Sequence, residues 1–517
     1  MTDALLKTPV LIVGGGLVGL SAGLFLQHHG IDFILIEQHA GVSPLPRARG
    51  IHLRTMELFR QIGLDAAIGD VAATAWRQGG FGGARRGRSL VEAQPLIDVS
   101  AMQKKLAAAG DSPSQFVACP QTLIEPVLRT HLQARGGDVR FGHRLLGFRQ
   151  DARGVQATVQ GPAGEPQAIA AAWMIGADGG GSTVRQQLGI GRDETAGPDH
   201  LVNIFFAADL AGAVAGRTFS QCEVANDRVQ GLFLAMNNTD RWSFHLKYDP
   251  AQGPPPAEAL PALLRAALGI EDIALEVISH GTWHTGVAIA QRYQQGRVLL
   301  CGDAAHLMPP WGGFNATTGI ADAHNLAWKL AAILQGHAGP DLLHSYTRER
   351  RPLAVRNGQQ ALLRTDFDAR FGIPTAGNRE VFAGLIDAGA LSLRYRYPAA
   401  GDGAADAALE PVAALHAQCG TRFPHAWLLC GGTRVSTLDL LGRGYVQLAG
   451  PAARLPHRAQ ASLDPAMPAT WVLGRDVQFA DAGYSWRTLT WLPDDGGVLV
   501  RPDGFVAARS DAAVASV

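Results

Sequence analysis

The apolar positions of this chain change period several times, and each change marks the end of one predicted element and the start of another. Residues 9–13 and 33–36 are short, β-prone apolar runs, and residues 20–29 between them have helical spacing. This pattern predicts a strand, a turn, a helix and a second strand. A similar unit returns later, where a buried strand at 298–301 leads through a glycine- and proline-containing loop into a helix that ends near residue 336.

Between these two units the sequence predicts further helices and a sheet. Helices are expected from residue 55 and over residues 121–135, and a meander follows from strands at 139–141, 147–149 and 155–159. From residue 201 to 249, apolar and polar positions alternate in four runs, which predicts a half-buried antiparallel sheet. A helix ending at residue 268 and a strand over 273–284 return the chain to the first unit. The domain that contains the first unit is therefore predicted to be discontinuous.

The last part of the chain predicts a separate module. A helical tract runs from residue 341 to about 390, and small residues and glycine accumulate at 398–405. Strand signals in the tail lie at 427–428, 445–448, 471–473 and 497–500. We therefore expect a small α/β domain after the boundary.

Composition excludes several classes of function. Lys plus Arg and Asp plus Glu both number 45 in 517 residues, so no global charge attracts nucleic acid or an acidic membrane surface. The five cysteines are scattered without a CxxC pair, and the seventeen histidines show no HExxH spacing, so no metal site is expected. Residues 8–27 carry no charge, but glycines interrupt them and no cleavage site follows. We therefore expect a cytoplasmic protein without a membrane span, either a monomer or a homodimer.

The N-terminal turn carries a dinucleotide-binding pattern. Gly14, Gly16 and Gly19 fit GxGxxG between the first predicted strand and helix. Gly14 permits the tight turn, Gly16 lets a pyrophosphate approach the backbone, and Gly19 lets the helix pack on the strand. Glu37 ends the second strand, where a carboxylate binds ribose hydroxyls.

Two further glycine clusters follow predicted strands. Gly176-Ala177-Asp178-Gly179 precedes a helix capped by Ser182 or Thr183, and Asp178 is expected to tie neighbouring turns or to orient Arg185. In the third cluster, Asp303 can accept a hydrogen bond from a ribityl hydroxyl, and the loop after it ends at a helix N-terminus. A glycine loop of this kind can also be only a connection between a strand and a helix, and not a cofactor site.

Together these clusters resemble those of the single-component FAD-dependent aromatic hydroxylases, the family of para-hydroxybenzoate and phenol hydroxylase. The resemblance rests on GxGxxG with Glu37, on GADG with Arg185, and on GDAAH at 302–306 followed by NLAWKL at 325–330. The tail resembles the thioredoxin-like extension of phenol and aromatic polyketide hydroxylases, through residues 422–428, 436–440 and 499–504. One departure is clear: where the family often reads GGxGxNxG, this chain has Asn315 and Thr317.

The resemblance implies a set of cofactor-binding residues. FAD adenosine would use Gly14, Gly16, Gly19 and Glu37, and the pyrophosphate or flavin would lie beside Arg47 and Gln121. Asp303 would bind the ribityl chain, and Pro310, Gly312 and Gly313 would line the isoalloxazine edge. Arg47 also admits two other interpretations, a contact with the nicotinamide phosphate and a solvated basic turn.

The resemblance also implies the chemistry. NADPH or NADH would reduce FAD, O2 would form a flavin C4a-hydroperoxide, and an aromatic, phenolic substrate would take one oxygen atom. Candidate pocket residues are Phe233, Phe244, His245, Trp283, His284 and Pro310, although the aromatic ones are also typical of a core. Two alternatives remain open: a Baeyer–Villiger monooxygenase on the same scaffold, and a flavin-binding protein without turnover.

The predicted fold class is α/β. It combines a Rossmann-like FAD-binding domain, an inserted and mostly antiparallel substrate-binding sheet domain, and a C-terminal thioredoxin-like domain. We expect the FAD-binding domain at 1–75, 116–180 and 285–395, the sheet domain at 76–115 and 181–284, and the third domain at 396–517.

Overall fold

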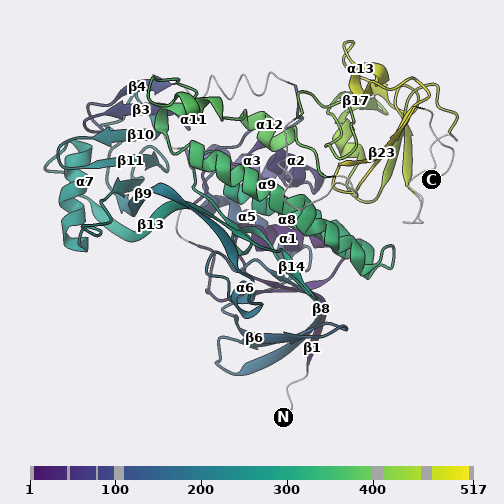
Figure 1. The fold of residues 1–517 in the computed structure, drawn as a ribbon, viewed down its shortest axis with the longest axis horizontal. Coiled ribbons are helices and arrows are strands. Elements are labelled where there is room, and N and C mark those ends of the chain that lie inside the picture. Colours follow the sequence, from purple (N-terminus) through teal and green to yellow (C-terminus); the bar gives the residue numbers. More distant parts are fainter. Residues whose placement is uncertain are drawn as a thin grey trace.

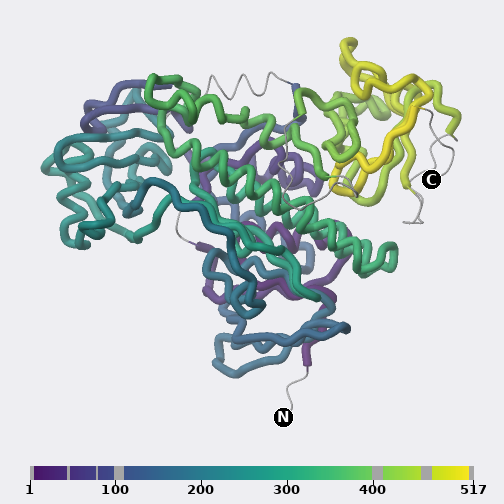
Figure 2. The backbone as a smooth tube through the Cα atoms, viewed as in Figure 1, coloured from purple at the N-terminus to yellow at the C-terminus, as the bar shows by residue number. Residues whose placement is uncertain are grey.

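The structure is a computed structural model that describes residues 5–43, 47–76, 80–97, 110–398, 412–455 and 468–511. The expected boundary at 398–405 therefore lies almost wholly outside the described residues, as does part of the expected sheet-domain segment at 76–115. Figure 1 shows a central α/β body, a second sheet on one side of it and the C-terminal module on the other. The backbone tube in Figure 2 shows the same arrangement, with the C-terminal module in yellow.

The first sheet has a parallel centre, with strand order β14-β15-β8-β1-β2-β5. Its strands are β1 (Leu6–Val13), β2 (Phe33–Glu37), β5 (Asp138–Phe141), β6 (Arg144–Gln150), β7 (Val155–Gln160), β8 (Pro166–Gly176), β14 (Gln294–Gln295) and β15 (Val298–Leu300). The meander expected from residue 139 onward is corrected at its start. β5 pairs in parallel with β2, and only β6 and β7 form a hairpin that continues into β8.

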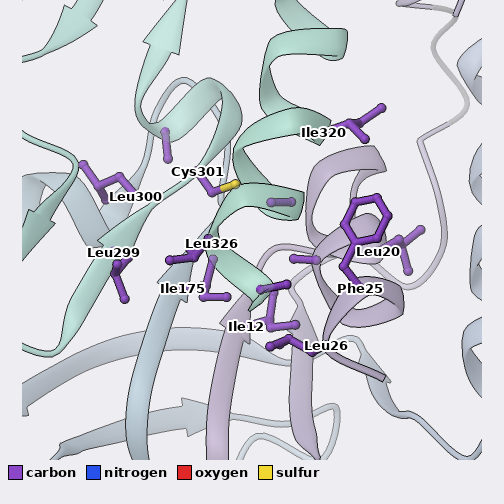
Figure 3. Packing of buried hydrophobic residues seen from close by; sticks show 14 of the residues in the cluster. Ile12, Leu20, Phe25, Leu26, Ile175, Leu299, Leu300, Cys301, Ile320 and Leu326 are labelled. Carbon is purple, nitrogen blue, oxygen red and sulfur yellow. The ribbon is translucent and has the colours of Figure 1, made fainter. Parts of the chain in front are cut away.

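Helices cover this sheet and complete its core. They are α1 (Leu17–His28), α2 (Leu53–Gln61), α3 (Asp65–Ala75), α5 (Gln121–Ala134), α6 (Thr183–Gln187) and α8 (Phe314–Leu334). Figure 3 shows Leu20 and Phe25 of α1, Ile320 and Leu326 of α8 and Ile12 of β1 as members of one cluster of buried side chains. All five side chains are at least 99% buried, so the two glycine-bearing strand–helix units share one core.

The second sheet has the order β16-β13-β9-β12-β11-β10-β3-β4 and is mostly antiparallel, with β3 parallel to β10. Its strands are β3 (Gly83–Gly87), β4 (Gln94–Ile97), β9 (Arg192–Ala207), β10 (Phe219–Ala225), β11 (Gln230–Ala235), β12 (Arg241–Lys247), β13 (Glu276–Ala290) and β16 (His306–Leu307). The long strands β9 and β13 run side by side from this sheet toward the central body (Figure 1). One face of the sheet is covered by α7 (Leu260–Leu268), and the short turn η1 (Ala257–Ala259) precedes that helix.

Long helices connect the central body and the second sheet. The chain passes through η2 (Gly302–Ala304), α8, η3 (Pro340–Leu343) and α9 (His344–Leu363). The helical tract predicted from residue 341 then continues as short pieces, α10 (Phe367–Arg370), α11 (Arg379–Ala383) and α12 (Ala388–Leu393).

The C-terminal module contains two small sheets. One has the order β18-β17-β21 and the other the order β20-β19-β22-β23. The elements are β17 (Trp427–Cys430), β18 (Thr433–Ser436), η4 (Thr437–Leu440), β19 (Val446–Ala449), β20 (Ala469–Val472), β21 (Gln478–Phe479), α13 (Trp486–Thr490), β22 (Gly497–Val500) and β23 (Val506–Ser510). The four-stranded sheet has a parallel pair at one edge and an antiparallel pair at the other, as a thioredoxin-like sheet does. The predicted fold class is confirmed.

Buried charges attach this module to the central body. Arg422 Nε donates to Glu57 Oε2 of α2 at 2.9 Å, and Arg501 Nη1 donates to Glu349 Oε1 of α9 at 2.7 Å. Both carboxylates are at least 95% buried. Any other orientation of the module would leave these buried charges unpaired, which is strongly destabilising. The two ion pairs therefore hold the module in one orientation on α2 and α9. Of the helices in the described segments, none combines the length and apolar character that crossing a membrane requires.

Candidate active site

The three glycines of the N-terminal turn have different surroundings. A Cβ on Gly14 would lie 2.2 Å from the Ala177 carbonyl oxygen, and a Cβ on Gly19 would lie 1.9 Å from the Gly14 carbonyl oxygen. Backbone fills both places, so these two glycines are needed for the turn itself. A Cβ on Gly16 would meet only Glu125 Oε1, at 3.6 Å. The space at Gly16 is therefore open to a ligand, as a pyrophosphate requires.

Glu37 lies beside this turn at the end of β2. Its Oε2 accepts a hydrogen bond from the Gly15 N–H at 2.8 Å, and its Oε1 accepts one from the His39 N–H at 2.8 Å. Strand β2 brings the carboxylate to the glycine turn because Ile36 pairs with Val13 at the end of β1. The structure thus places Glu37 where the sequence predicted it. Its contact with a ribose remains a prediction.

Helix α5 supplies a residue that the sequence analysis missed. Glu125 Oε1 accepts from the Leu17 N–H at the start of α1 at 2.9 Å, and from Gln121 Nε2 at 2.6 Å. Burial raises the pKa of the Glu125 carboxyl, although these donors and the charge of Arg47 oppose that shift. Gln121 and Arg47 are therefore near Glu125 at the N-terminus of α1, and their contact with a pyrophosphate or flavin remains a prediction. The four-residue spacing of Gln121 and Glu125 on one helix was the available signal.

The second glycine cluster has a structural role. Asp178 accepts from Ser182 Oγ at 2.6 Å and from the Val184 N–H at 3.0 Å, and Ser182 caps α6. Arg185 instead donates to the Ile190 carbonyl oxygen at 3.0 Å. Of the two roles predicted for Asp178, tying neighbouring turns is the one that the structure has.

The third cluster lies against the first. Gly302 has a φ of +62°, and a Cβ there would come within 2.8 Å of Val18 in the first turn of α1. Asp303 follows it and accepts from Asn315 Nδ2 of α8 at 2.8 Å. The two glycine loops are therefore adjacent.

A buried polar chain leads away from Asp303. Asn315 Oδ1 accepts from His306 Nδ1 at 3.0 Å, and His306 Nε2 donates to Asp322 Oδ2 at 2.8 Å. Arg350 Nε in turn donates to Asp322 Oδ1 at 2.7 Å. Burial alone would lower the pKa of His306, but Asp322 raises it above the usual 6.5. Asn315, which stands where the family often has glycine, thus links His306 to Asp303.

The loop between β16 and α8 is shaped by two glycines with positive φ, Gly312 at +88° and Gly313 at +70°. His52 Nε2 donates to the Gly312 carbonyl oxygen at 2.8 Å, which holds the loop against the N-terminus of α2. Pro310 is exposed, whereas its neighbour Trp311 is only 5% exposed. Gly313 is the N-cap of α8, so free backbone N–H groups begin directly after the loop.

Three of the candidate pocket residues are corrected, two of them because of strand alternation. Phe233 of β11 and Phe244 of β12 are fully buried in a core with Leu264 and Leu268 of α7. That face of the sheet is turned away from Trp311, because successive side chains of a strand point to opposite faces. His284 is also corrected, since it is exposed and packs near His200.

The opposite face brings two candidates together with the loop. His245 of β12 lies 5.4 Å from the Trp283 ring and 5.9 Å from the Trp311 ring, between ring centroids. Burial, and then the charges of Arg49 and Arg370, lower the pKa of His245 to about 3, so its imidazole is neutral at pH 7. The sequence analysis missed Trp311, although its place between Pro310 and Gly312 was a signal. We call this group, His245, Trp283 and Trp311, the ring triad.

Comparisons with known proteins agree with this arrangement. The FAD binding domain family matches residues 7–361, and the aromatic-ring hydroxylase C-terminal family matches residues 416–516. The chain is 37% identical over 536 residues to tetracenomycin A2 monooxygenase-dioxygenase of Streptomyces glaucescens, and the match covers 98% of this chain and 94% of that protein. It is 36% identical over 531 residues to 4-methyl-5-nitrocatechol 5-monooxygenase of a Burkholderia species, with coverage of 98% and 94%.

A solved structure shows the same fold. The crystal structure of a ternary complex of aklavinone-11 hydroxylase with FAD and aklavinone has a TM-score of 0.87 and 32% sequence identity, and the match covers 100% of this chain and 97% of that chain. The family match extends over more than half of the sequence and includes the open turn at Gly16. The chain therefore belongs to the FAD-dependent aromatic-ring hydroxylases, and it is a flavin-dependent monooxygenase.

Proposed function

We propose that this monooxygenase hydroxylates a multi-ring phenolic substrate held between the second sheet and the loop before α8. The observation that carries the proposal is an apolar cluster at this place. It joins Leu232 and Leu234 of β11 to Trp311 of the loop and to Phe367 and Phe371 around α10. A flat aromatic molecule fits a site with apolar walls and few polar groups. Relatives named for tetracenomycin A2 and aklavinone support a multi-ring substrate, and the nitrocatechol relative supports a phenolic one.

We assign FAD to the two adjacent glycine loops. Gly14 and Gly19 form the turn, Gly16 admits the pyrophosphate, and Glu37 binds the ribose. Arg47 compensates the negative charge of the phosphate. It also compensates the charge of Glu125, which would otherwise repel the phosphate. Gln121 holds Glu125 back at the α1 N-terminus. When bound, reduced FAD supplies the activation of O2, with NADPH or NADH as the proposed source of electrons.

The loop residues are assigned to the flavin ring. Asp303 binds the ribityl chain, and Pro310, Gly312 and Gly313 follow the isoalloxazine edge. The N-terminus of α8 begins at Gly313 and offers partial positive charge to any negative charge that develops there. Asn315 orients Asp303 through its side-chain amide.

On the substrate side, His245 orients a phenol without removing its proton. Because the pKa of this buried imidazole is about 3, it is a weak base at pH 7. The apolar walls exclude water from the reacting carbon, which favours transfer of oxygen to the substrate over its loss to solvent.

We also propose the domain division given by the sequence, with FAD-binding segments at 1–75, 116–180 and 285–395, the sheet domain at 76–115 and 181–284, and the third domain at 396–517. One detail supports a small shift, since β13 continues to Ala290 within the second sheet. The five cysteines are free thiols, which supports the cytoplasm as the compartment.

The decisive test is turnover under 18O2 with NADPH and a panel of polycyclic phenols. We expect NADPH consumption that a suitable phenol stimulates, and a product that carries one 18O atom on an aromatic carbon. A product in which the oxygen lies between a carbonyl carbon and its neighbour would identify a Baeyer–Villiger enzyme instead. Binding of FAD and phenols without any NADPH consumption would identify a binding protein without turnover.

A further inference from the structure

Asn315 joins Asp303 to His306 through the two ends of one side-chain amide. Its Nδ2 donates to Asp303 Oδ1 of η2 at 2.8 Å, and its Oδ1 lies 3.0 Å from His306 Nδ1. The other ring nitrogen, His306 Nε2, donates to Asp322 Oδ2 at 2.8 Å. His306 and Asp322 are fully buried, so these contacts, and not solvent, determine where the hydrogen atoms lie.

The position of each hydrogen atom follows from what each group can donate. A carboxylate only accepts, so the Asn315 amide must turn its NH2 group toward Asp303. Turned the other way, the amide oxygen would face a carboxylate oxygen with no hydrogen between them. The oxygen of Asn315 therefore faces His306 Nδ1, and that nitrogen must carry a hydrogen. Since Asp322 requires a hydrogen on Nε2 as well, all four groups are satisfied only when the imidazole carries both protons.

The surroundings of His306 stabilise this doubly protonated form. Burial lowers the pKa of His306, but Asp322 and, more weakly, Asp303 raise it above the usual 6.5. Arg350 of α9 donates to the other oxygen of Asp322 and keeps its own charge at every pH considered. The Tyr293 ring lies 6.4 Å from that of His306, and burial raises the pKa of Tyr293 well above its ordinary value. His306 therefore loses its charge at neutral to alkaline pH, whereas Arg350 and Tyr293 keep theirs unchanged.

Loss of one proton from His306 disturbs the link to Asp303. Nε2 keeps its proton because Asp322 faces it, so Nδ1 gives up its proton as the pH rises. The bare nitrogen only accepts, and the Asn315 oxygen then meets repulsion in both orientations, at His306 or at Asp303. Arg192 of β9 also faces Asp303, but its charge is the same before and after. Asn315 therefore holds the Asp303 carboxylate in one place only while His306 is a cation.

We propose that Asn315 is a positioning residue for FAD, through which the affinity of this chain for FAD depends on the protonation of His306. This inference rests on the proposed function, in which Asp303 binds the ribityl chain, and names the regulation of that site. A carboxylate held at one oxygen keeps the other free for a ribityl hydroxyl and loses less side-chain entropy on binding. A glycine at 315 has no side chain for either contact, so it would abolish the dependence.

The test is the pH dependence of FAD affinity between pH 6 and pH 9. The apoprotein is titrated with FAD, and the dissociation constant is measured from flavin fluorescence without NADPH. Over this range we expect the wild type to lose roughly 10-fold more affinity than Asn315→Ala, as for one hydrogen bond to a charged group. His306→Gln has no proton to lose and should show the same shallow dependence as Asn315→Ala. Circular dichroism checks the folding of both variants.

Glu125 makes a control necessary. Burial raises the pKa of its carboxyl, so it also gains charge as the pH rises and would repel the pyrophosphate. Every variant keeps this effect, so the difference between two profiles is the quantity that counts. The matched control is His324→Gln in the same helix, where the buried ring contacts Gln61 Oε1 at 2.6 Å and packs against Phe25. This variant should keep the wild-type steepness.

The pH profile separates positioning from a purely structural role. If Asn315 only stabilised the fold, Asn315→Ala would weaken FAD binding by the same factor at every pH. Equal steepness in the wild type, Asn315→Ala and His306→Gln would overturn the proposal, as would a shallow profile in the wild type. FAD binding is measured without turnover, so these results leave the proposed hydroxylation, which oxygen labelling tests, unaffected.

Discussion

Replacing Gly16 by alanine separates the two tasks of the N-terminal glycine turn, folding and FAD binding. Gly16 has φ −79° and ψ −173°, a backbone conformation that alanine adopts without strain, and the nearest atom to an added Cβ is Glu125 Oε1 at 3.6 Å. Alanine reduces the entropy of the unfolded chain by about 0.4–1 kcal/mol but is a poorer N-cap than glycine by a similar amount. We therefore expect the free energy of unfolding of the apoprotein to change by less than about 1 kcal/mol.

FAD binding should respond differently. The new methyl group would occupy the space that we assign to the pyrophosphate, and a hydrogen bond to a charged group contributes about 1.5–3 kcal/mol. Loss of one such bond corresponds to a dissociation constant roughly 10- to 150-fold weaker. In Gly19→Ala, by contrast, the Cβ would lie 1.9 Å from the Gly14 carbonyl oxygen, so the turn itself should fail.

The assay compares urea unfolding of the apoproteins with FAD titrations followed by flavin fluorescence. The expected result for Gly16→Ala is near-normal stability with weak FAD binding, and for Gly19→Ala it is loss of stability. If Gly16→Ala bound FAD as tightly as the wild type, the pyrophosphate would not lie at Gly16. If both variants lost stability to the same extent, the space beside Gly16 would not be open to a methyl group.

Three further predictions concern the buried charges and thiols. Arg422→Ala leaves a buried carboxylate with one partner fewer and should lower the free energy of unfolding by about 3–5 kcal/mol, whereas Arg434→Ala, at an exposed ion pair, should change it by less than about 1 kcal/mol. A difference below 1 kcal/mol between the two in urea unfolding would contradict this. The raised pKa of His306 implies stability that is complete below pH 6.5 and is lost as the pH rises through the higher folded-state pKa, so His306→Gln should flatten the dependence of the melting temperature on pH from 6 to 9. An unchanged slope would show that His306 is neutral. The double variant Cys419→Ser with Cys430→Ser should keep wild-type NADPH consumption, since the pair lacks CxxC spacing. This would be refuted if the double variant lost NADPH consumption and treatment of the wild type with a reductant caused the same loss.

The cofactor half of this protein is determined by local sequence. The turn at Gly14 and Gly19 requires residues without a Cβ at fixed steps after a strand, and the helical period that follows lets α1 pack on β1. These constraints act within about thirty residues, so the spacing alone predicted the turn and Glu37 at the end of β2. The loop that follows Gly302 and Asp303 was predicted for the same reason, because a buried strand and a helix N-terminus leave few paths between them.

The substrate half was decided by tertiary structure. Alternation showed that β11 and β12 have two faces, but not which face the loop before α8 would meet. The packing of α7 against Phe233 and Phe244 decided this, and it left His245 facing Trp311. Local sequence cannot contain that choice, because it depends on whether a given face of the sheet packs against α7 or against the loop before α8, which are separate segments of the chain.

The same limit explains why the sequence did not predict the contact of Glu125 or the pairing of β5. Glu125 reaches the N-terminus of α1 across 108 residues, and β5 joins β2 in the parallel sheet instead of the meander that follows it in sequence. Both arrangements depend on pairing between distant segments, whose partners the residues around each position do not specify. Sequence periods determined the elements and the cofactor loops, and the long-range packing of those elements determined which side chains surround the substrate.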